Sequence, residues 1–380
     1  MDQDKPIMFI SPVDWNYYPY RDQELPRSMA ERGYRCIYLN PVRYRGSENA
    51  VRFARLDQRE DHPRVRIIDR RSRWGKSFIE FIHEQLSNIR AIRRYRPGAV
   101  ISSDHLISLG PCLYCRVKGI PFVFDVTDRW ELVDRSRAGM VYRLILKPLL
   151  ARFSFAITCT SNQQFLEFKK RRKKNTYLIS NGIAPRTLEQ LDQIRDTQAD
   201  TSEVNFVGSL RDWYDFGLLV DVFKEFPDIR LNIYGWGSLF EELQEMTADV
   251  PNVHVHGNLE NRRIPVLLGR TLFGILPLKE NQLNHATCPI KLFDYWGASK
   301  AVISTPVREV RRVGGETVLY ASGRDEFVEC IKKLTGDRDL LVRLGREGRK
   351  KIDETHNYDH ITNQFLTILN PARCGRTNKH

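Results

Sequence analysis

The chain has 380 residues, of which 41% are hydrophobic and 28% charged, a balance that argues against a disordered or membrane-spanning protein. Its length exceeds what one hydrophobic core usually organises, so two domains are expected. Lysine and arginine total 60 against 47 acidic residues, a net charge of +13, which favours an anionic partner: nucleic acid, an acidic membrane surface or a phosphorylated substrate.

Short β-rich runs alternate with longer helical stretches along the whole chain. In the first half these runs are KPIMFIS, RCIYLN, VRIID, AVISS, PFVFDVT, FAITCTS and TYLIS, and in the second half EVNFVG, RLNIYG, VHVHG, LFGILP and AVIST. The alternation predicts an α/β protein with parallel sheets covered by helices on both faces. The runs are nearly continuous in apolar residues, as doubly covered strands require.

The alternation stops between Gly182 and Ser202, where the sequence becomes polar. We therefore predict two Rossmann-like domains, residues 1–185 and 203–356, joined by a linker at 186–202. A last helix within 357–370 can pack back on the first domain, and 371–380 form a tail. Ligands of such folds bind beyond the carboxyl ends of the strands, so function is expected in strand-end loops facing a cleft.

Basic residues concentrate in the first half, in RRSRWGKSF, RAIRRYR and KKRRKK. These clusters are either solvated helix faces or a surface for an acidic membrane. The most apolar long stretch, residues 140–159, carries Arg143, Lys147 and Arg152, which are costly inside a bilayer. No signal peptide fits the start of the chain. The expectation is a cytoplasmic protein attached peripherally to the inner face of the membrane.

Metal and disulfide patterns are weak. Seven scattered cysteines predict reduced thiols, and the CxxC of Cys112 and Cys115 has no second pair, so a buried helix turn explains it better than a metal site. Asp-x-Asp triplets occur only near the N-terminus and before a late helix, not at a strand end. No metal and no cofactor is expected.

One run in the second domain combines charge with a core-forming pattern. CPIKLFDYWGASKAVIST places Lys291 in the first turn of a helix that Pro289 begins and Gly297 ends. An ammonium group beside the amides of a helix start favours a phosphate. Asp294, one turn later on the same face, can accept hydrogen bonds from ribose hydroxyls. The alternative is an ordinary surface ion pair between Lys291 and Asp294.

Another candidate loop follows EVNFVG. Gly208 lets a backbone approach a ligand closely, and Arg211 comes three residues later, where it can meet a phosphate or remain a solvated loop residue. The glycines of YGWG do not make a dinucleotide fingerprint, because no third glycine and no ribose-binding acid follow at the usual distance.

With these motifs the chain resembles the GT-B glycosyltransferases of the family 1 and family 4 kind. FVGSL, YGWG, VHVHGNL, ILPL and PIKLFDYWGASKAVIST are similar to their donor-binding half, which usually carries P-x-K-L-x-E-Y, and LISNGI is similar to the segment that closes their first domain. The resemblance implies a nucleotide-diphosphate sugar bound by Gly208, Arg211, His256, Gly257, Lys291 and Asp294.

The resemblance also implies which part of the donor each of these residues would contact. Lys291 and Arg211 would contact the diphosphate, Asp294 the ribose, and residues 256–257 would lie near the base. Retaining members of the related E-x7-E type carry a glutamate eight residues before the ribose acid, where this chain has Ala286. That departure argues against retention by that route.

The first domain should supply the acceptor site and any catalytic base. Inverting relatives carry an aspartate just beyond a strand, so the resemblance favours Asp128 in FVFDVTDRWE as the base, with Asp125 as second choice; either acid can instead cap the next helix. Trp15, with the neighbouring Asp14, follows the first strand and can contact an acceptor sugar or lipid, or belong to a packed loop.

The leading hypothesis is a metal-independent glycosyltransferase acting on a lipid-linked or polysaccharide acceptor at the inner membrane surface. A GT-B-shaped sugar-nucleotide epimerase would share the donor half without needing a basic surface. A nucleic-acid-binding protein fits the net charge, but no RNA-binding or zinc pattern supports it, so no nucleic-acid partner is expected.

Overall fold

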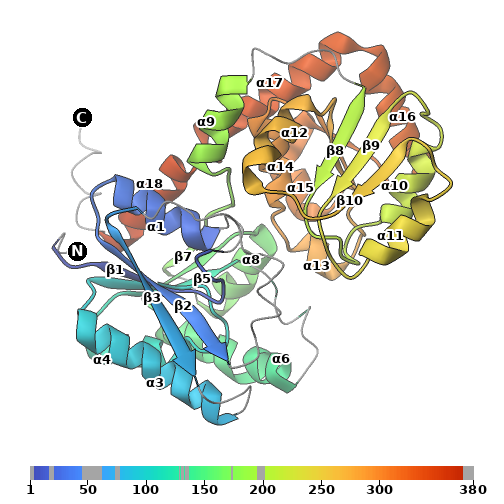
Figure 1. The fold of residues 1–380 in the computed structure, drawn as a ribbon. Helices are drawn as coiled ribbons and strands as arrows, with labels where there is room; N and C mark the ends of the chain where they lie inside the picture. Colours follow the sequence, from blue (N-terminus) through green and yellow to red (C-terminus); the bar gives the residue numbers. More distant parts are fainter. Residues whose placement is uncertain are drawn as a thin grey trace, which may run out of the picture. The chain divides into compact units, whose positions relative to one another are not determined.

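The computed structural model describes residues 4–16, 21–44, 62–72, 78–127, 129, 132, 137–172, 174–194 and 202–370. The chain divides into two compact units, one made of Met1–Ser180 with Tyr358–His380 and the other of Asn181–Asn357. Each unit is a parallel β-structure with helices packed against its strands (Figure 1). The predicted α/β class is confirmed.

The first unit contains one seven-stranded, parallel sheet in the order β3-β2-β1-β4-β5-β6-β7. Its strands are β1 (Ile7–Ile10), β2 (Cys36–Tyr44), β3 (Val65–Ser72), β4 (Ala99–Ser102), β5 (Phe122–Val126), β6 (Ala156–Cys159) and β7 (Thr176–Leu178). Its helices are α1 (Arg21–Glu31), α3 (Phe78–Tyr95), α4 (Leu109–Val117), α6 (Arg137–Val141), the π-helical turn η1 (Tyr142–Leu146), α7 (Lys147–Phe153), α8 (Asn162–Arg171) and α18 (Tyr358–Leu369).

Strand β1 shows that helices cover both faces of this sheet. All four of its residues are buried, and successive side chains of a strand point to opposite faces. Ile7 and Phe9 join the core that includes residues of α1 and α18, whereas Met8 and Ile10 join the core that includes residues of α4, α7 and α8. The continuous apolar run in the sequence is therefore the signature of a central strand.

The second unit has two three-stranded parallel sheets, β10-β9-β8 and β11-β12-β13. Its strands are β8 (Glu203–Val207), β9 (Arg230–Tyr234), β10 (Val253–His256), β11 (Gly274–Leu276), β12 (Val302–Ser304) and β13 (Val318–Tyr320). Its α-helices are α9 (Pro185–Ile194), α10 (Phe216–Phe223), α11 (Phe240–Thr247), α12 (Ile264–Arg270), α13 (Gln282–His285), α14 (Ile290–Gly297), α15 (Arg308–Gly314), α16 (Arg324–Gly336) and α17 (Arg338–Glu354). Two 3-10 turns, η3 (Asn261–Arg263) and η4 (Gly315–Thr317), complete it.

A buried hydroxyl group joins these two sheets. The backbone amide of Asn205 in β8 donates to Thr271 Oγ1 at 2.9 Å, and the amide of Leu272 donates to the carbonyl of Glu203 at 2.7 Å. Strand β8 therefore lies beside the segment that enters β11. The strands of the second unit act as one layer, and the ends of β8, β9 and β10 define one edge of it.

The boundary between the units differs from the predicted linker. Residues 186–202 were expected to connect the domains, but Pro185–Ile194 form helix α9 inside the second unit. Arg349 of α17 binds Asp192 of α9 at 2.6 Å, and Leu191 of α9 is buried. The polar composition of this segment reflects a helix with one narrow buried stripe.

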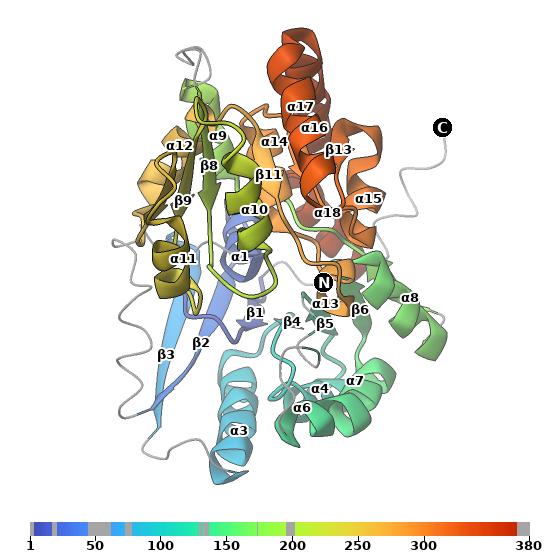
Figure 2. The same cartoon turned by 90° about the vertical axis from the view of Figure 1, so that its right-hand side faces the viewer.

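Helix α18 belongs to the first unit although it ends the chain. Ser28 Oγ in α1 donates to the carbonyl of Tyr358, and Phe365 and Ile361 lie in the same core as Phe9 and Met29. The chain thus returns to the unit in which it began, as the turned view also shows (Figure 2).

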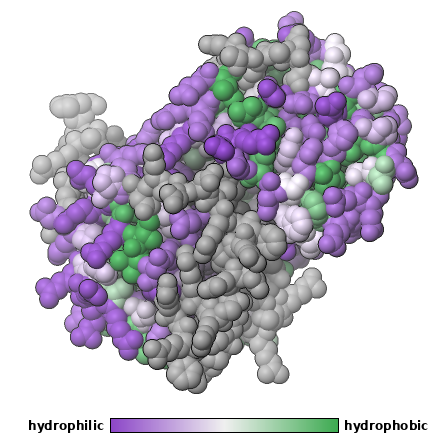
Figure 3. All heavy atoms as spheres, in the orientation of Figure 1, coloured by the Kyte–Doolittle hydropathy of each residue, from purple (hydrophilic) through white to green (hydrophobic). Residues whose placement is uncertain are grey.

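Among the residues coloured in Figure 3, polar side chains predominate on this face, with smaller apolar areas between them. Within the described ranges, no helix has both the length and the apolar character needed to cross a bilayer. Cys112 and Cys115 belong to helix α4 and are buried in the core, in agreement with the expected helix turn.

Candidate functional site

Glycine loops follow β8 and β9 at the carboxyl edge of the second unit. Gly208 has φ +152° and Gly235 has φ +141°, both in the region that favours glycine. The amide of Gly208 donates to the carbonyl of Tyr234 at 2.9 Å, and a Cβ on Gly235 would lie 1.8 Å from the Gly208 oxygen. The two loops therefore pack backbone to backbone, which only glycine permits.

Substitution of Gly235 by alanine is expected to destabilise the second unit by about 2 kcal/mol or more, because strain at a positive φ adds to a clash with a backbone oxygen. Gly217→Ala is the matched control: its Cβ would meet only Asp215 Oδ1 at 3.8 Å, and helix α10 gains from alanine. Urea unfolding of both variants checks this. Equal stability of the two variants would contradict the backbone-packing account.

Lys291 lies directly over the first of these loops. A Cβ on Gly208 would come within 2.2 Å of Lys291 Nζ, so the ammonium group occupies the space that the missing side chain leaves. The same ammonium lies 5.3 Å from the ring centroid of Phe206 and 5.1 Å from that of Tyr214. Among the described residues, no hydrogen bond or salt bridge neutralises it. This is an open cation at the glycine-lined edge.

Asp294 follows Lys291 by one turn of α14. Its carboxyl is half-buried, and burial raises its pKa to about 7, although the positive charge of Lys291 acts in the opposite direction. Within the described part of the chain, its side chain has no hydrogen-bond partner. The two residues do not form the surface ion pair that was the alternative. Asp294 instead retains carboxylate oxygens that can accept hydrogen bonds from a ligand.

The raised pKa makes the stability of the second unit depend on pH. The folded state holds the Asp294 proton more tightly than the unfolded chain, so this contribution is lost as pH rises through about 7. Asp294→Asn is therefore expected to raise the melting temperature by a few degrees at about pH 8, an advantage that disappears near pH ~4. Thermal unfolding at both values measures it. A gain that is independent of pH would exclude burial of the charge as its cause.

The other predicted donor residues lie on the same edge. The carbonyls of His256 and Gly257, after β10, accept from the amide of Gly235 at 3.4 and 3.2 Å. The His256 ring stacks on Tyr234 with centroids 4.4 Å apart, and burial, followed by the charge of His254, lowers its pKa. Its Nε2 lies 3.1 Å from Asn232 Oδ1. This end of the sheet offers a stacked, uncharged imidazole.

Arg211 is in the loop between β8 and α10, three residues after Gly208. Its side chain is exposed, and among the described residues it has no salt bridge or hydrogen bond. The structure therefore brings Gly208, Lys291, His256 and Gly257 to one edge, and it leaves the Arg211 side chain exposed and, among the described residues, without a partner.

Tight contacts fix helix α14 in position. Tyr295 Oη donates to the carbonyl of Asn205 in β8 at 3.0 Å, and Asn181 Nδ2 donates to the carbonyl of Cys288 just before the helix at 3.0 Å. On the other side a Cβ at Gly348 of α17 would overlap the Trp296 indole at 2.1 Å. Such packing allows Lys291 little freedom. Asn181 belongs to LISNGI, so that segment supports the start of α14.

Asp125 in the first unit has a structural role. It is 3% exposed, its Oδ2 accepts from Arg21 Nε at 2.8 Å, and its Oδ1 accepts from Arg21 Nη2 at 3.2 Å and from Thr158 Oγ1 at 2.7 Å. A carboxylate held by a bidentate guanidinium and a hydroxyl is a poor base. The geometry does not fit the predicted catalytic role of Asp125. Asp128, the preferred base, lies outside the described residues.

Trp15 is also a core residue. Its side chain is fully buried, edge-on to Tyr38 at 4.9 Å and beneath the Arg27 guanidinium, and its amide donates to Asn40 Oδ1 at 2.8 Å. The buried side chain of Trp15 favours the packed-loop alternative, and its contact with an acceptor stays a prediction. Asp14 is half-buried and accepts from the amide of Asn16 at 3.0 Å, so its acceptor role stays a prediction.

One buried acid not predicted from the sequence, Asp22, lies in the first turn of α1. Its Oδ1 accepts hydrogen bonds from Ser11 and Ser103, which follow β1 and β4. The chain order reverses between these two neighbouring strands, which is where ligands bind in such sheets. Burial, the largest influence, raises the pKa of Asp22 to about 6. Both strand runs end in serine, the one sequence signal that pointed here.

Among the described residues, no group of three or more histidine, cysteine or acidic side chains is placed to hold a metal ion.

The chain is similar to known glycosyltransferases. The model of a family described as glycosyl transferase-like matches residues 211–367. A protein named as the teichuronic acid biosynthesis glycosyltransferase TuaH, from Bacillus subtilis (strain 168), is 21% identical over 286 residues, 67% of this chain and 70% of TuaH. The family match includes Arg211 and the whole of α14.

Solved structures agree on the fold. Sucrose-phosphate synthase from Thermosynechococcus elongatus superposes with a TM-score of 0.72 at 14% identity, covering 98% of this chain and 100% of that one. HepE from Anabaena, in complex with UDP and glucose, gives a TM-score of 0.69 at 13% identity, with coverage of 97% and 100%. The fold is the GT-B fold, as predicted, and the family match supports the predicted enzyme class, a glycosyltransferase. The roles of individual residues stay predictions.

Proposed function

We propose that this chain transfers a sugar from a nucleotide-diphosphate donor to a lipid-linked or polysaccharide acceptor at the inner surface of the membrane. One observation carries the proposal: the Lys291 ammonium rests on Gly208, at the end of β8, without a carboxylate partner among the described residues. An uncompensated cation against an open backbone suits a diphosphate. Asp294, one turn away, suits the ribose hydroxyls.

In this proposal Lys291 acts on the leaving group. As the glycosidic bond to the donor breaks, negative charge grows on the diphosphate, and a fixed ammonium stabilises that charge more in the transition state than in the ground state. Arg211 and the first amides of α14 add to the field. This neutralisation takes the place of a metal ion, so the reaction needs neither metal nor other cofactor.

The relatives support the donor and acceptor classes. The HepE structures contain UDP or UDP-glucose, and TuaH carries teichuronic acid biosynthesis in its name. For this chain we therefore propose a uridine-type nucleotide sugar as the donor, and an anionic cell-surface polysaccharide or its lipid-linked precursor as the acceptor. If the reaction inverts the anomeric configuration, Asp128 is the proposed base. The position of the E-x7-E glutamate is occupied by Ala286, which is fully buried.

A donor screen tests the function. Purified protein is mixed with a panel of nucleotide sugars and with a membrane extract as acceptor, and nucleotide release is followed with and without EDTA. Release that depends on one donor and on the extract, and persists in EDTA, is the expected result. Interconversion of the donor sugar without acceptor would identify an epimerase instead, and a thermal shift with oligonucleotides alone would favour a nucleic-acid-binding protein.

A further inference from the structure

An apolar turn is exposed on the surface of the first unit. Four large side chains of α6 and η1 point to solvent, with exposed fractions of 49% for Met140, 40% for Val141, 62% for Leu144 and 52% for Ile145. Tyr142 and Leu146, between and beyond them, are buried in the core. The outer face of this helix is thus apolar where it meets water. Arg143 is the one charged side chain between these four.

The spacing of these residues accounts for the exposure. Residues 140, 141, 144 and 145 are spaced i, i+1, i+4 and i+5, so they share one side of the helical segment, while Tyr142 and Leu146 lie on the side that faces the core. Four adjacent apolar side chains are more than the scattered single residues of a typical surface.

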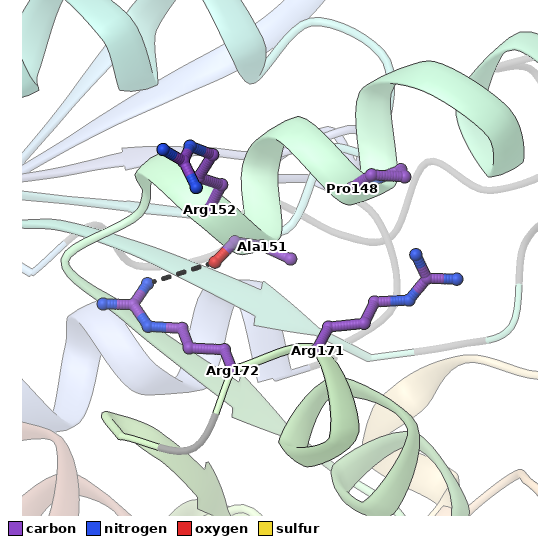
Figure 4. A pocket seen from close by; sticks show the side chains of 5 residues that line it. All are labelled: Pro148, Ala151, Arg152, Arg171 and Arg172. Carbon is purple, nitrogen blue, oxygen red and sulfur yellow. Dashed lines mark hydrogen bonds between the residues drawn. The ribbon is translucent and has the colours of Figure 1, made fainter.

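Arginines surround a pocket on the continuation of the same helix. Pro148, Ala151 and Arg152 of α7 line it together with Arg171 and Arg172 at the end of α8, and its volume is about 330 Å³ (Figure 4). Helices α6, α7 and α8 follow one another along this side of the unit (Figure 2). The pocket therefore begins one turn beyond the exposed apolar side chains.

The arginines of this pocket have no carboxylate partner among the described residues, and hydrogen bonds hold one of them, Arg172, in place. Arg172 donates to the carbonyls of Ala151, Ser154 and Phe155 at the end of α7, which holds its guanidinium in place. The one acidic side chain of α8, Glu167, is already bound to Lys147 at 2.8 Å. Within the described residues, no carboxylate pairs with Arg152, Arg171 or Arg172. The field of these arginines thus remains available to an anion.

A further cation joins from helix α4. The guanidinium groups of Arg116 and Arg152 both lie within 6 Å of the Phe153 ring centroid, at 5.7 and 5.8 Å. Burial lowers the pKa of Arg172, and the neighbouring charge of Arg116 lowers it further. The protein therefore holds like charges together at this point, which an incoming phosphate would relieve.

We propose that this face, made of α6, η1, α7 and the end of α8, docks onto an anionic phospholipid bilayer, with Met140, Val141, Leu144 and Ile145 inserted among the acyl chains and a lipid phosphate in the arginine pocket. Apolar side chains beside fixed cations are the pattern of a helix that lies in the membrane interface. The proposal rests on the proposed function, which requires a membrane, and gives that function its contact surface.

The distribution of charge favours a bilayer over a protein partner. The basic side chains spread over four elements, with Arg116 on α4, Arg143 on η1, Arg152 on α7, and Arg171 and the lysines on α8, so they do not gather at one point that a single complementary acid could neutralise. A surface of many phosphates satisfies all of them at once.

Flotation with vesicles tests the apolar part. The full-length protein and a Leu144→Ser/Ile145→Ser variant are mixed with vesicles of phosphatidylglycerol and phosphatidylcholine in equal amounts. The variant is expected to lose about tenfold or more in vesicle partitioning, because two inserted side chains become polar. Val342→Ser on α17 of the second unit, 40% exposed, is the matched control and should float like the wild type. Unchanged partitioning of the double variant overturns the proposal.

Charge reversal tests the pocket. Arg152→Glu/Arg171→Glu is expected to lose about tenfold in partitioning to the mixed vesicles and to lose the preference over pure phosphatidylcholine. Arg343→Glu/Lys350→Glu on α17 makes the same change of net charge and should retain that preference. Equal losses in the two variants overturn the proposal, because net charge and not the pocket would then govern binding. Competition by inorganic phosphate alone, without vesicle binding, overturns it as well.

Thermal shift with UDP separates this inference from the proposed function. Both face variants should keep the UDP-induced shift of the wild type, since they lie in the first unit and the donor residues in the second. Loss of flotation with the shift retained supports the membrane face. Wild-type flotation without any nucleotide turnover rejects the proposed function and leaves the membrane face supported.

Discussion

Replacement of Lys291 by methionine is expected to lower the turnover of the nucleotide-sugar donor by about two to three orders of magnitude. Methionine keeps an unbranched stem over the rings of Phe206 and Tyr214, so packing is preserved while the charge is removed. Because the ammonium stabilises charge that develops on the leaving diphosphate, the loss should fall mainly on kcat. Steady-state kinetics of nucleotide release measure it.

Two further variants sharpen this prediction. Lys350→Met on α17, an exposed lysine of the same unit, should keep wild-type kinetics and controls for net charge. Lys291→Arg should recover only part of the activity, because a guanidinium is too wide for the space above Gly208. A Lys291→Met variant with unchanged kcat would remove the central element of the proposed donor site.

The fold followed from the sequence wherever strands are central. A run such as KPIMFIS predicts a central strand from its own residues alone, because every residue of β1 is buried on one face of the sheet or the other. Helix α9 was missed since its segment is polar except for the stripe that contains Leu188 and Leu191, which meet Gly297. A helix with so few apolar residues is stabilised by its neighbours, and those neighbours lie far along the chain.

The site was predictable in the second unit for a topological reason. Parallel strands bring their carboxyl ends to one edge, so Gly208 and the segment before Lys291 had to meet there. In the first unit the same rule placed Asp125 and Trp15 near strand ends, but it could not decide whether their side chains point into the core or toward a ligand. Arg21, which forms the ion pair with Asp125, is 104 residues away in sequence, so no local sequence pattern predicts this pair.

The candidate donor site of the second unit and the Arg21–Asp125 pair of the first unit use charge differently. In the second unit, glycines at 208, 235 and 348 remove side chains so that backbones and helix α14 approach closely, and Lys291 remains open. In the first unit, the buried cation Arg21 is completely engaged. Preorganisation for a ligand needs the former arrangement, because a charge that already has a partner must lose it before it can bind anything else.

Asp125→Ala is expected to destabilise the first unit by about 3–5 kcal/mol, because it leaves the buried Arg21 guanidinium without its counter-ion. Among the described residues, the other direct contacts of Arg21 are the carbonyl of Ser180 at 3.1 Å and the ring of Phe365 at 5.2 Å, which carry no negative charge, while the Asp22 carboxyl acts on Arg21 without a direct hydrogen bond. Urea unfolding that resolves the transition of the first unit measures the loss of free energy.

A double-variant comparison isolates the pair. Arg21→Met combined with Asp125→Ala should lose less stability than Asp125→Ala alone, since no buried charge then remains unpaired. Asp125→Asn keeps the shape and the hydrogen bond from Thr158, and its activity per folded molecule should approach that of the wild type. If Asp125→Asn instead folds with unchanged stability and loses transfer by orders of magnitude, Asp125 is the base after all, and Arg21 must move away during catalysis to release it.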